Sequence, residues 1–424
     1  MQTLRQDAQA IIDRALQDAQ PDAAVRCALA QISLPPGRLV LIAAGKAAWQ
    51  MARAAYDALG SRIDAGVIIT KYGHAQGQIG ALACYEAGHP LPDENSCRAT
   101  ARALELVSGL HPDDAVLFLL SGGASSLFEL PLLPLDELRG LTQQLLSCGA
   151  DIVQINTLRK RFSAVKGGKF ALRCQPAQVF SIVLSDVLGD RLDMIASGPA
   201  CVDPSTSAEA LAIAEQYALR LSDAARQLLQ APTPKHLPNV HTYLTGSVRQ
   251  LCASASAAAE ALGYRPVLLT DTLCCTARDA GSFLASVART HQSSPISLAF
   301  LAGGETVVRV TGSGLGGRNQ ELALSAAPQL AGLSHTAVFS FGSDGTDGPT
   351  DAAGGYCDTH TCAALAAQGI SIPDVLQNND AYHALQACDG LNRTGPTGTN
   401  VNDLAVLLIR RNAPDAAAKK SQED

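Results

Sequence analysis

The sequence is poor in aromatic and charged residues. Phe, Trp and Tyr make up 4% of the 424 residues, and Asp, Glu, Lys and Arg make up 17%. The hydrophobic fraction is nevertheless 47%, so the interior must be built mainly from Ala, Val, Leu and Ile. Such side chains, together with 36 glycines, suit a close-packed α/β protein and exclude a disordered chain. The length exceeds one ordinary core, so two domains are expected.

An excess of positive charge is also missing. The net charge of −7 argues against nucleic acid as a partner, because phosphate backbones bind basic surfaces. No apolar run approaches the roughly 18 to 20 residues that span a bilayer, and no signal-peptide core is present. The 12 cysteines form no regular framework, which is typical of reduced thiols. We therefore expect a cytoplasmic protein without a membrane or nucleic-acid partner.

Short apolar runs that end in Gly, Ser or Asp alternate with Ala-rich helical segments. This alternation predicts largely parallel sheets that are covered by helices on both faces. The predicted strands are residues 39–43, 65–69, 115–120, 179–184, 240–244, 266–269, 296–302, 306–310, 336–341 and 404–409.

Two of these runs indicate that the second sheet is mixed. Residues 296–302 and 306–310 are too close for a crossover helix, so we predict an antiparallel hairpin between them. At the other end of the chain, residues 1–30 have the apolar periodicity of an amphipathic helix.

The predicted domain boundary falls in the Pro-rich stretch 231–238, which is the best candidate for a linker. Residues 1–235 are predicted to form a Rossmann-like domain with a largely parallel sheet flanked by helices. Residues 236–412 are predicted to form a second α/β domain with a mixed sheet, and residues 413–424 a disordered tail.

The loop after the first predicted strand carries a lysine where a helix should begin. Lys46 follows Gly45 and precedes an Ala-rich segment. A helix N-terminus favours an anion and disfavours a cation, so a lysine there is costly unless an anion is bound. We predict that Lys46 binds a phosphate; a solvated surface lysine is the alternative.

A serine- and glycine-rich loop follows the strand predicted at 115–120. Glycines let the backbone approach a ligand, and serine hydroxyls with backbone N–H groups can cradle an anion. The predicted cradle consists of Ser121, Gly122, Gly123, Ala124, Ser125 and Ser126. It is not a Walker A loop, because the chain contains no Gly-x4-Gly-Lys-Ser/Thr. An ordinary strand-to-helix turn is the alternative.

The one concentrated basic region precedes an aspartate at a strand end. Arg159, Lys166 and Lys169 are predicted to bind substrate or phosphate. Asp186 follows the strand predicted at 179–184, where it could accept a proton or, together with Asp190, hold Mg²⁺. A solvated helix face followed by a turn aspartate is the alternative.

Residues 312–317 satisfy the dinucleotide fingerprint Gly-x-Gly-x-x-Gly. The preceding strand is predicted as a hairpin arm, and no acid follows at the fingerprint's spacing, so a dinucleotide loop is the less favoured alternative. We interpret the segment as a loop that delivers Arg318 to a site, with Asn319 and Glu321 in the first helical turn. Arg318 is suited to stabilise charge on a transferring phosphoryl group.

A loop rich in aspartate and glycine follows the strand predicted at 336–341. Each of its acids, Asp344 among them, is typical of a turn or a helix cap. Grouped at the carboxyl end of a strand, they are equally suited to bind a ligand or a metal, and we predict that Asp344 and Thr346 contact the ligand.

Taken together and in order, these loops resemble class II glycerate kinases, the glycerate 2-kinase group with a C-terminal MOFRL domain. The motifs that carry the resemblance span nearly the whole chain; they are Ala44-Gly-Lys-Ala47, Gly88-His-Pro-Leu-Pro-Asp93, Leu120-Ser-Gly-Gly-Ala-Ser-Ser126, Asn156-Thr-Leu-Arg-Lys160, Gly167-Gly-Lys169, Leu184-Ser-Asp-Val187, Ala196-Ser-Gly-Pro199, Gly303-Gly-Glu-Thr306, Gly316-Gly-Arg-Asn-Gln-Glu321, Gly342-Ser-Asp-Gly-Thr-Asp-Gly-Pro-Thr-Asp-Ala-Ala-Gly354 and Gly395-Pro-Thr-Gly-Thr-Asn-Val-Asn-Asp-Leu404.

The resemblance implies a transferase that uses ATP and Mg²⁺ to phosphorylate D-glycerate, with 2-phosphoglycerate as product. It implies that Lys46 and Arg318 act at the reacting phosphate, and Glu305 of the Gly-Gly-Glu-Thr motif joins the predicted ligand contacts. Asp186 would orient the attacking hydroxyl. Family members are also called hydroxypyruvate reductases, so an NAD(P)H-dependent reductase is the alternative. A monomer or a homodimer is expected.

Overall fold

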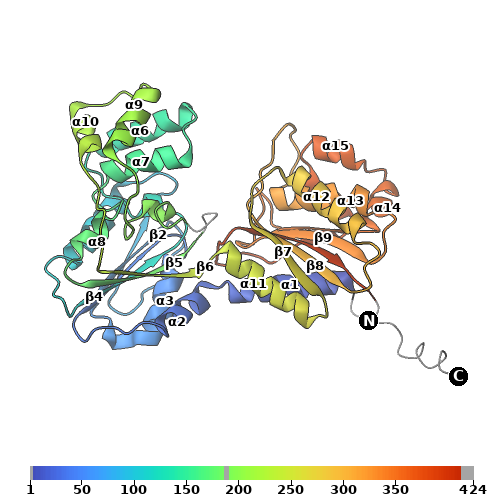
Figure 1. Ribbon diagram of the computed structural model, residues 1–424, viewed down its shortest axis with the longest axis horizontal. Coiled ribbons are helices and arrows are strands. Elements are labelled where there is room, and N and C mark those ends of the chain that lie inside the picture. The colour runs from blue at the N-terminus through green and yellow to red at the C-terminus, as the bar shows by residue number, and fades with distance from the viewer. Residues whose placement is uncertain (1–2, 186–190, 412–424) are drawn as a thin grey trace. The chain divides into compact units, whose positions relative to one another are not determined.

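The computed structural model describes residues 3–185 and 191–411, and the chain divides into two compact units (Figure 1). Pro21–Gly246 form one, here called the N-terminal unit. Met1–Gln20 and Ser247–Asp424 form the other, the C-terminal unit. The predicted tail at 413–424 lies outside the described residues.

The sheet of the N-terminal unit is entirely parallel, as the continuous apolar runs predict. Its strands in spatial order are β3 (Ala83–Ala87), β2 (Ala65–Lys71), β1 (Leu39–Ala44), β4 (Ala115–Leu120), β5 (Gln178–Leu184) and β6 (Val240–Gly246). The chain moves outward from β1 in one direction and then, from β4, in the other, so the strand order reverses between these two strands. The Rossmann-like prediction is confirmed, and ligands in such sheets bind beyond the carboxyl ends of strands at this switch point.

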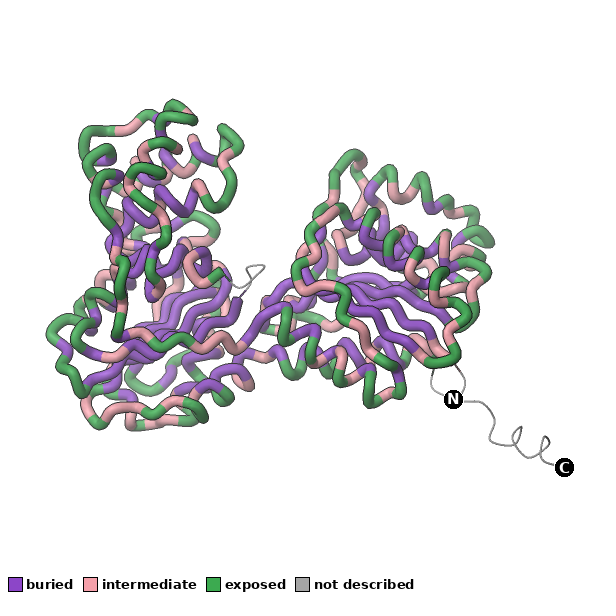
Figure 2. The backbone as a smooth tube through the Cα atoms, viewed as in Figure 1, coloured by how far each residue is buried: buried purple, intermediate pink, exposed green. Residues whose placement is uncertain are grey.

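Alternating residues of β1 belong to different cores, so both faces of the sheet are buried. Val40 and Ile42 pack into one core and Leu39 and Leu41 into the other. The first core includes residues of α4 (Glu94–Leu106) and of the short helices α5 (Ala124–Leu127) and α8 (Lys169–Arg173). The second includes residues of α2 (Pro21–Leu29) and α3 (Ala48–Leu59). Figure 2 shows the strands buried and much of the helices' outer surface exposed.

Four helices of this unit pack around a core of their own, away from the sheet (Figure 1). They are α6 (Leu135–Ser147), α7 (Ile152–Phe162), α9 (Ser207–Gln216) and α10 (Asp223–Gln230). Two 3₁₀ turns, Gly60–Arg62 and Ile195–Ser197, complete the unit. The stretch 231–238, predicted as a linker, lies inside the unit: Thr233 Oγ1 and Lys235 Nζ bond to Asp203, at 2.9 and 2.5 Å.

The C-terminal unit has a mixed sheet, as predicted. Its strands in spatial order are β11 (Leu391–Asn392), β10 (Gly354–Asp358), β9 (Thr336–Gly342), β12 (Asp403–Ile409), β8 (Leu298–Gly304) and β7 (Arg265–Leu273). Among the described pairs of this second sheet, β7 and β8 are parallel and the others are antiparallel.

The predicted hairpin between 296–302 and 306–310 is wrong. Strand β8 pairs with β7 on one side and β12 on the other, so neither of its edges is left for a hairpin partner. The segment at 306–310 instead runs as irregular chain, with one bridge from Val307 to Thr276. The sheet is mixed because β12 lies antiparallel between β8 and β9.

Helices cover both faces of this sheet (Figure 1). Helices α1 (Leu4–Asp18) and α11 (Val248–Ala261) pack together on one face. The other face carries α12 (Ala277–Thr290) and α13 (Arg318–Leu330), with three shorter helices beside them: α14 (Thr361–Ala366), α15 (Ile372–Gln377) and α16 (Ala381–Ala387). No helix in the described parts of the chain is long and apolar enough to cross a membrane.

A buried polar contact joins the first helix to the C-terminal unit, in addition to its packing against α11. The Asp7 carboxylate of α1 accepts hydrogen bonds from Tyr264 Oη at 2.6 Å and Arg410 Nη1 at 2.8 Å. The predicted domain of residues 1–235 therefore differs from the observed unit at both ends. Residues 1–20 join the other unit, and β6 extends the N-terminal unit to Gly246. The single helix predicted over 1–30 is two helices, one in each unit.

Candidate active site

The loops after β1 and β4 meet at the switch point of the parallel sheet. Ser121 N–H donates to the Ala44 carbonyl at 3.0 Å, and Lys46 N–H donates to the Gly122 carbonyl at 2.9 Å. Ser121 Oγ accepts from the Ala47 N–H at 3.1 Å. These bonds hold the Lys46 backbone against the predicted serine cradle, so the structure brings two of the predicted site elements together.

Basic side chains gather around Lys46. Burial, followed by the positive charges of Lys46, Lys71 and His74, lowers the pKa of His89. The backbone carbonyl of Lys46 is contacted by His74 Nδ1 at 3.2 Å and accepts from Thr70 Oγ1 at 3.3 Å. Lys46, His74 and His89 follow β1, β2 and β3, and Lys71 ends β2, so the carboxyl end of the sheet concentrates positive charge. An anion is the ligand that this end of the sheet suits.

Lys71 and His74 were not predicted as site residues, and His89 entered only through the Gly88–Asp93 motif of the family resemblance. Lys71 ends β2, and its position after an apolar run is the same signal that identified Lys46. His89 follows β3, a partly exposed edge strand without the continuous apolar run that marks the buried strands.

Gly123 lies between the side chains of Lys46 and His89. Its φ is +84°, and a Cβ there would lie 3.0 Å from His89 Cδ2 and 3.3 Å from Lys46 Cγ. A non-glycine residue would therefore be destabilised by the left-handed backbone conformation, and its Cβ would displace the two basic side chains.

We expect Gly123→Ala to lower kcat at least about tenfold while costing only about 1–2 kcal/mol of unfolding free energy. Gly140→Ala is the matched control, because Gly140 lies inside α6 with nothing within 4 Å of the added Cβ. That variant should gain about 0.5–1 kcal/mol. Initial rates and urea titrations of both variants test the contrast, and equal rates for the two alanine variants would contradict it.

Two basic side chains, the part-buried Arg159 and the buried Lys166, hold the rest of the predicted cradle. The Ser125 carbonyl accepts from Arg159 Nη2 at 2.9 Å and from Lys166 Nζ at 2.7 Å. Ser126 Oγ donates to the Gly123 carbonyl at 3.2 Å. Ser125 Oγ lies 3.3 Å from Ser197 Oγ.

The predicted phosphate ligands Lys166 and Lys169 are engaged inside the protein. Lys166 is fully buried beside Glu129, at 3.1 Å, and burial lowers its pKa to about 8. Lys169 donates to the carbonyls of Lys160, Arg161 and Ser163 at 2.7–3.2 Å, and burial likewise lowers its pKa to about 8. Their contacts fix the backbone around the cradle. Asp186 and Asp190 lie outside the described residues.

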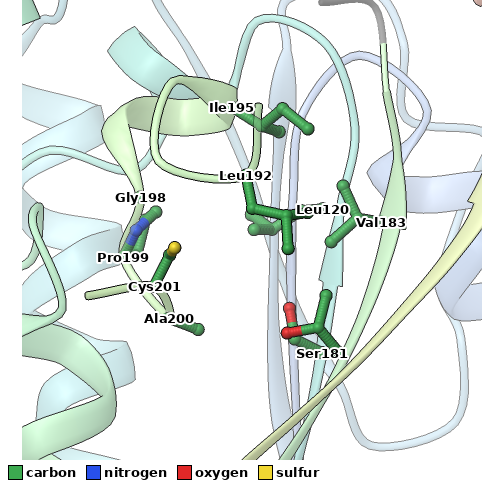
Figure 3. Close-up of a pocket in the computed structure, with 10 residues that line it drawn as sticks. Leu120, Ser181, Val183, Leu192, Ile195, Gly198, Pro199, Ala200 and Cys201 are labelled. Carbon is green, nitrogen blue, oxygen red and sulfur yellow. The ribbon is translucent and has the colours of Figure 1, made fainter. Parts of the chain in front are cut away.

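A small apolar cavity lies beside the carboxyl ends of β4 and β5 (Figure 3). Leu120, Val183, Leu192 and Ile195 are among its lining residues. Its volume of about 10 Å³ is at the lower limit for one water molecule, so it is a packing gap and not a ligand site.

A second group of charged side chains lies at the N-terminus of α13 in the C-terminal unit. Arg318 donates from Nε and Nη2 to the Asp403 carboxylate at 2.5 and 2.9 Å, and its Nη1 lies 3.3 Å from Glu305 Oε1. The pKa of Arg318 is raised, because hydrogen bonds and charge from Asp403 outweigh its burial. Arg318 therefore stays charged, and Asp403 fixes the direction of its guanidinium group.

The N-terminus of α13 is already capped by a carboxylate. Asp347 accepts from the Asn319 and Gln320 N–H groups at 3.1 and 2.8 Å. Burial raises the pKa of Asp347 to about 6, although both N–H bonds and Arg318 oppose the rise. Asp347 could not be distinguished from the other acids of its loop in the sequence, because its role depends on how that loop folds against α13.

The raised pKa of Asp347 predicts that the unfolding free energy of the protein depends on pH. Because its pKa is raised on folding, the native state holds a proton that the unfolded state loses as pH rises from about 4 to 6. Its contribution to stability is present below about pH 4 and falls by about 2–3 kcal/mol as pH rises to about 6. Asp347→Asn keeps a cap and should remove this dependence. Urea unfolding of both proteins from pH 4 to 7 measures it, and parallel curves would refute the assignment.

The other residues of this unit that were predicted to contact the ligand are hydrogen-bonded within the protein. Glu321 accepts from Arg278 Nε at 2.8 Å and Asn379 Nδ2 at 3.1 Å. Asn319 Oδ1 accepts from Ser340 Oγ at 2.5 Å. The carboxylate of Asp344 accepts from the backbone N–H and hydroxyl of Thr346 at 3.0 and 3.2 Å, which is the geometry of a turn.

The glycine loop before α13 is not built for a dinucleotide. The N–H groups of Thr311 and Gly312 donate to Asn379 Oδ1, at 2.7 and 3.0 Å. Those of Ser313 and Gly314 donate to Asn378. With these amides engaged and the helix N-terminus capped by Asp347, the groups that would bind a pyrophosphate are already bonded.

Comparison with known families assigns both parts of the chain. A family model described as a domain of unknown function, DUF4147, matches residues 7–230. The MOFRL family model matches residues 298–403.

Two relatives and a solved structure are similar over nearly the full length. A protein of Thermotoga maritima named D-glycerate 2-kinase is 50% identical over 96% of this chain and 99% of its own. A protein of Agrobacterium vitis with the provisional name hydroxypyruvate reductase is 39% identical over 96% and 94%. The crystal structure of a glycerate kinase from Thermotoga maritima superposes with a TM-score of 0.93 at 50% identity and covers 96% of this chain and 99% of that one.

Proposed function

Because the chain belongs to the class II glycerate kinase family, with its DUF4147 and MOFRL domains, we propose that it is a glycerate 2-kinase. It transfers the γ-phosphate of ATP to the 2-hydroxyl of D-glycerate and produces 2-phosphoglycerate and ADP. The observation that carries this proposal is the group of basic side chains around Lys46 at the switch point, since both substrates are anions.

We propose roles in this reaction for two cationic side chains, Lys46 and Arg318. Lys46 neutralises charge on the transferring phosphoryl group, and its backbone is fixed by the Ser121 loop. Arg318 is proposed to stabilise charge on a phosphate, with a guanidinium group that Asp403 orients. Groups that are oriented in advance stabilise developing charge without reorganising during the reaction. We propose that Asp186 orients the attacking hydroxyl.

Mg²⁺ is proposed to arrive with the nucleotide, where it would neutralise phosphate charge. Within residues 3–185 and 191–411, no group of three His, Cys, Asp or Glu side chains could hold a metal. A nucleotide-bound Mg²⁺ needs only one or two protein carboxylates, and Asp186 with Asp190 are proposed for that role. We also propose that the protein is cytoplasmic and a monomer or homodimer.

An enolase-coupled assay tests the proposed function. The protein is incubated with D-glycerate, ATP and Mg²⁺, and the product is offered to enolase alone, which consumes 2-phosphoglycerate and not the 3-isomer. A signal from enolase supports the proposed reaction. ADP without that signal would refute the 2-position, and no ADP across several hydroxy acids would refute the kinase.

The reductase alternative is less well supported by the geometry. It requires a bound NAD(P)H, whereas the amides of the glycine loop and the N-terminus of α13 are bonded to Asn378, Asn379 and Asp347. NADH oxidation with hydroxypyruvate is the measurement that would restore it.

A further inference from the structure

A pocket of about 520 Å³ lies beside the N-terminus of α13 in the C-terminal unit. Its apolar lining comes from Val307, Val308 and Val310, with Pro349 and Ala381. This volume is within the range of pockets that bind cofactors and drug-sized ligands, and it is far more than a three-carbon acid needs.

Two features of the lining suit a ligand-binding surface. Val307 and Val310 are 57% and 76% exposed. They lie in an irregular segment close to the proposed active-site residue Arg318. Thr306 is only 4% exposed, yet its hydroxyl has no hydrogen-bond partner among the described residues. A buried hydroxyl without a partner is costly and uncommon, so a bound molecule is the natural source of its bond.

The charges of the pocket restrict what that molecule is. Glu305, Glu321 and Asp347 line it, against a single lining cation, Arg318. An acidic lining repels the carboxylate of glycerate and also a polyphosphate. It suits hydroxyl and amino groups, which donate hydrogen bonds to carboxylates.

We propose that this pocket binds the nucleoside moiety of the phosphate donor, with the base against the valine segment and the sugar hydroxyls toward the carboxylates and Thr306. The inference rests on the proposed kinase function, because ATP is the one substrate of that reaction with an uncharged, apolar-faced part. It assigns the nucleoside to the C-terminal unit, and the phosphates lie on the side of the pocket that Arg318 lines.

Binding of ADP with Mg²⁺ to the full chain, measured by calorimetry, tests this assignment. Val310→Asp should weaken ADP binding about tenfold or more, because it replaces a valine-sized apolar contact with a charge. Ile296→Asp is the matched control, since Ile296 is an exposed β-branched residue of the same unit outside the pocket. The control should bind ADP as the wild type does.

Thr306→Val provides a second test, in which ADP binding should weaken while the stability of the protein should not fall. The exchange removes a hydroxyl that has no partner in the ligand-free chain, so unfolding free energy should stay constant or rise. ADP binding should weaken several-fold, and the KM for D-glycerate should not change. A residue with only a structural role would not show this combination.

The outcomes separate the inference from the proposed function. Wild-type binding of ADP that is weakened in both variants supports the pocket assignment even if no glycerate is phosphorylated. Glycerate phosphorylation with an unchanged KM for ATP in both variants would overturn the assignment and leave the kinase intact. Wild-type protein that binds no ADP at millimolar concentration would also overturn it.

Discussion

Replacement of Lys46 by methionine should lower kcat for glycerate phosphorylation by about a hundred- to a thousandfold. The proposed role of Lys46 is to neutralise charge that develops on the phosphoryl group, and methionine keeps the length of the side chain without the charge. Lys46→Arg keeps a positive charge in a different shape and should retain more activity than the methionine variant.

The fold should tolerate this change. The hydrogen bonds that position Lys46 among the described residues are made by its backbone, to Gly122, Thr70 and His74, and the substitution leaves them in place. The free energy of unfolding should therefore change by no more than about 0.5 kcal/mol. Full activity of Lys46→Met would remove Lys46 from the mechanism, whereas a large loss of stability would show that its ammonium group has a structural role.

Replacement of Arg318 by methionine should reduce both activity and stability. A charge-stabilising arginine contributes about 10³–10⁵ in kcat to phosphoryl transfer. Its loss also leaves Asp403, which is 5% exposed, as a buried carboxylate without its cation. Breaking such a pair costs on the order of 2–4 kcal/mol when one partner is half-exposed.

A double variant separates the two effects. Asp403→Asn removes the buried charge, so Arg318→Met with Asp403→Asn should recover most of the lost stability while activity stays low. Urea unfolding and the enolase-coupled rate, measured on the two single variants and the double variant, complete the cycle. Recovery of activity in the double variant would show that Arg318 serves only to neutralise Asp403.

The N-terminal sheet was largely predictable because its central strands are buried on both faces and read as continuous apolar runs. Strands β1, β2, β4 and β5 begin within one residue of the predicted positions. The segment at 306–310 has the same β-branched composition but forms only the bridge from Val307 to Thr276, because β12 occupies the edge of β8 that a hairpin would use. Such competition for an edge depends on residues about 100 positions away and has no local signal.

The candidate site, like the fold, was predictable from the sequence only in part. Lys46 and the Ser121 loop could be selected from their places after strands, and the sheet topology brings them together. The sequence could not predict that Lys166 and Lys169 point into the protein. The orientation of Lys166 depends on Glu129 and the Ser125 carbonyl, and that of Lys169 depends on carbonyls such as that of Ser163 after α7. A run of basic residues looks the same in sequence whether it faces solvent, a ligand or the protein interior.

The attachment of α1 to the C-terminal unit has a consequence for the order of events during synthesis. Asp7 leaves the ribosome before any of its partners: Tyr264 follows 257 positions later and Arg410 follows 403 positions later. The N-terminal unit can fold as it emerges, while the helix ahead of it waits for about 230 residues to pass. A stalled or truncated chain would thus display the apolar face of α1 uncovered, and quality-control chaperones recognise such a face.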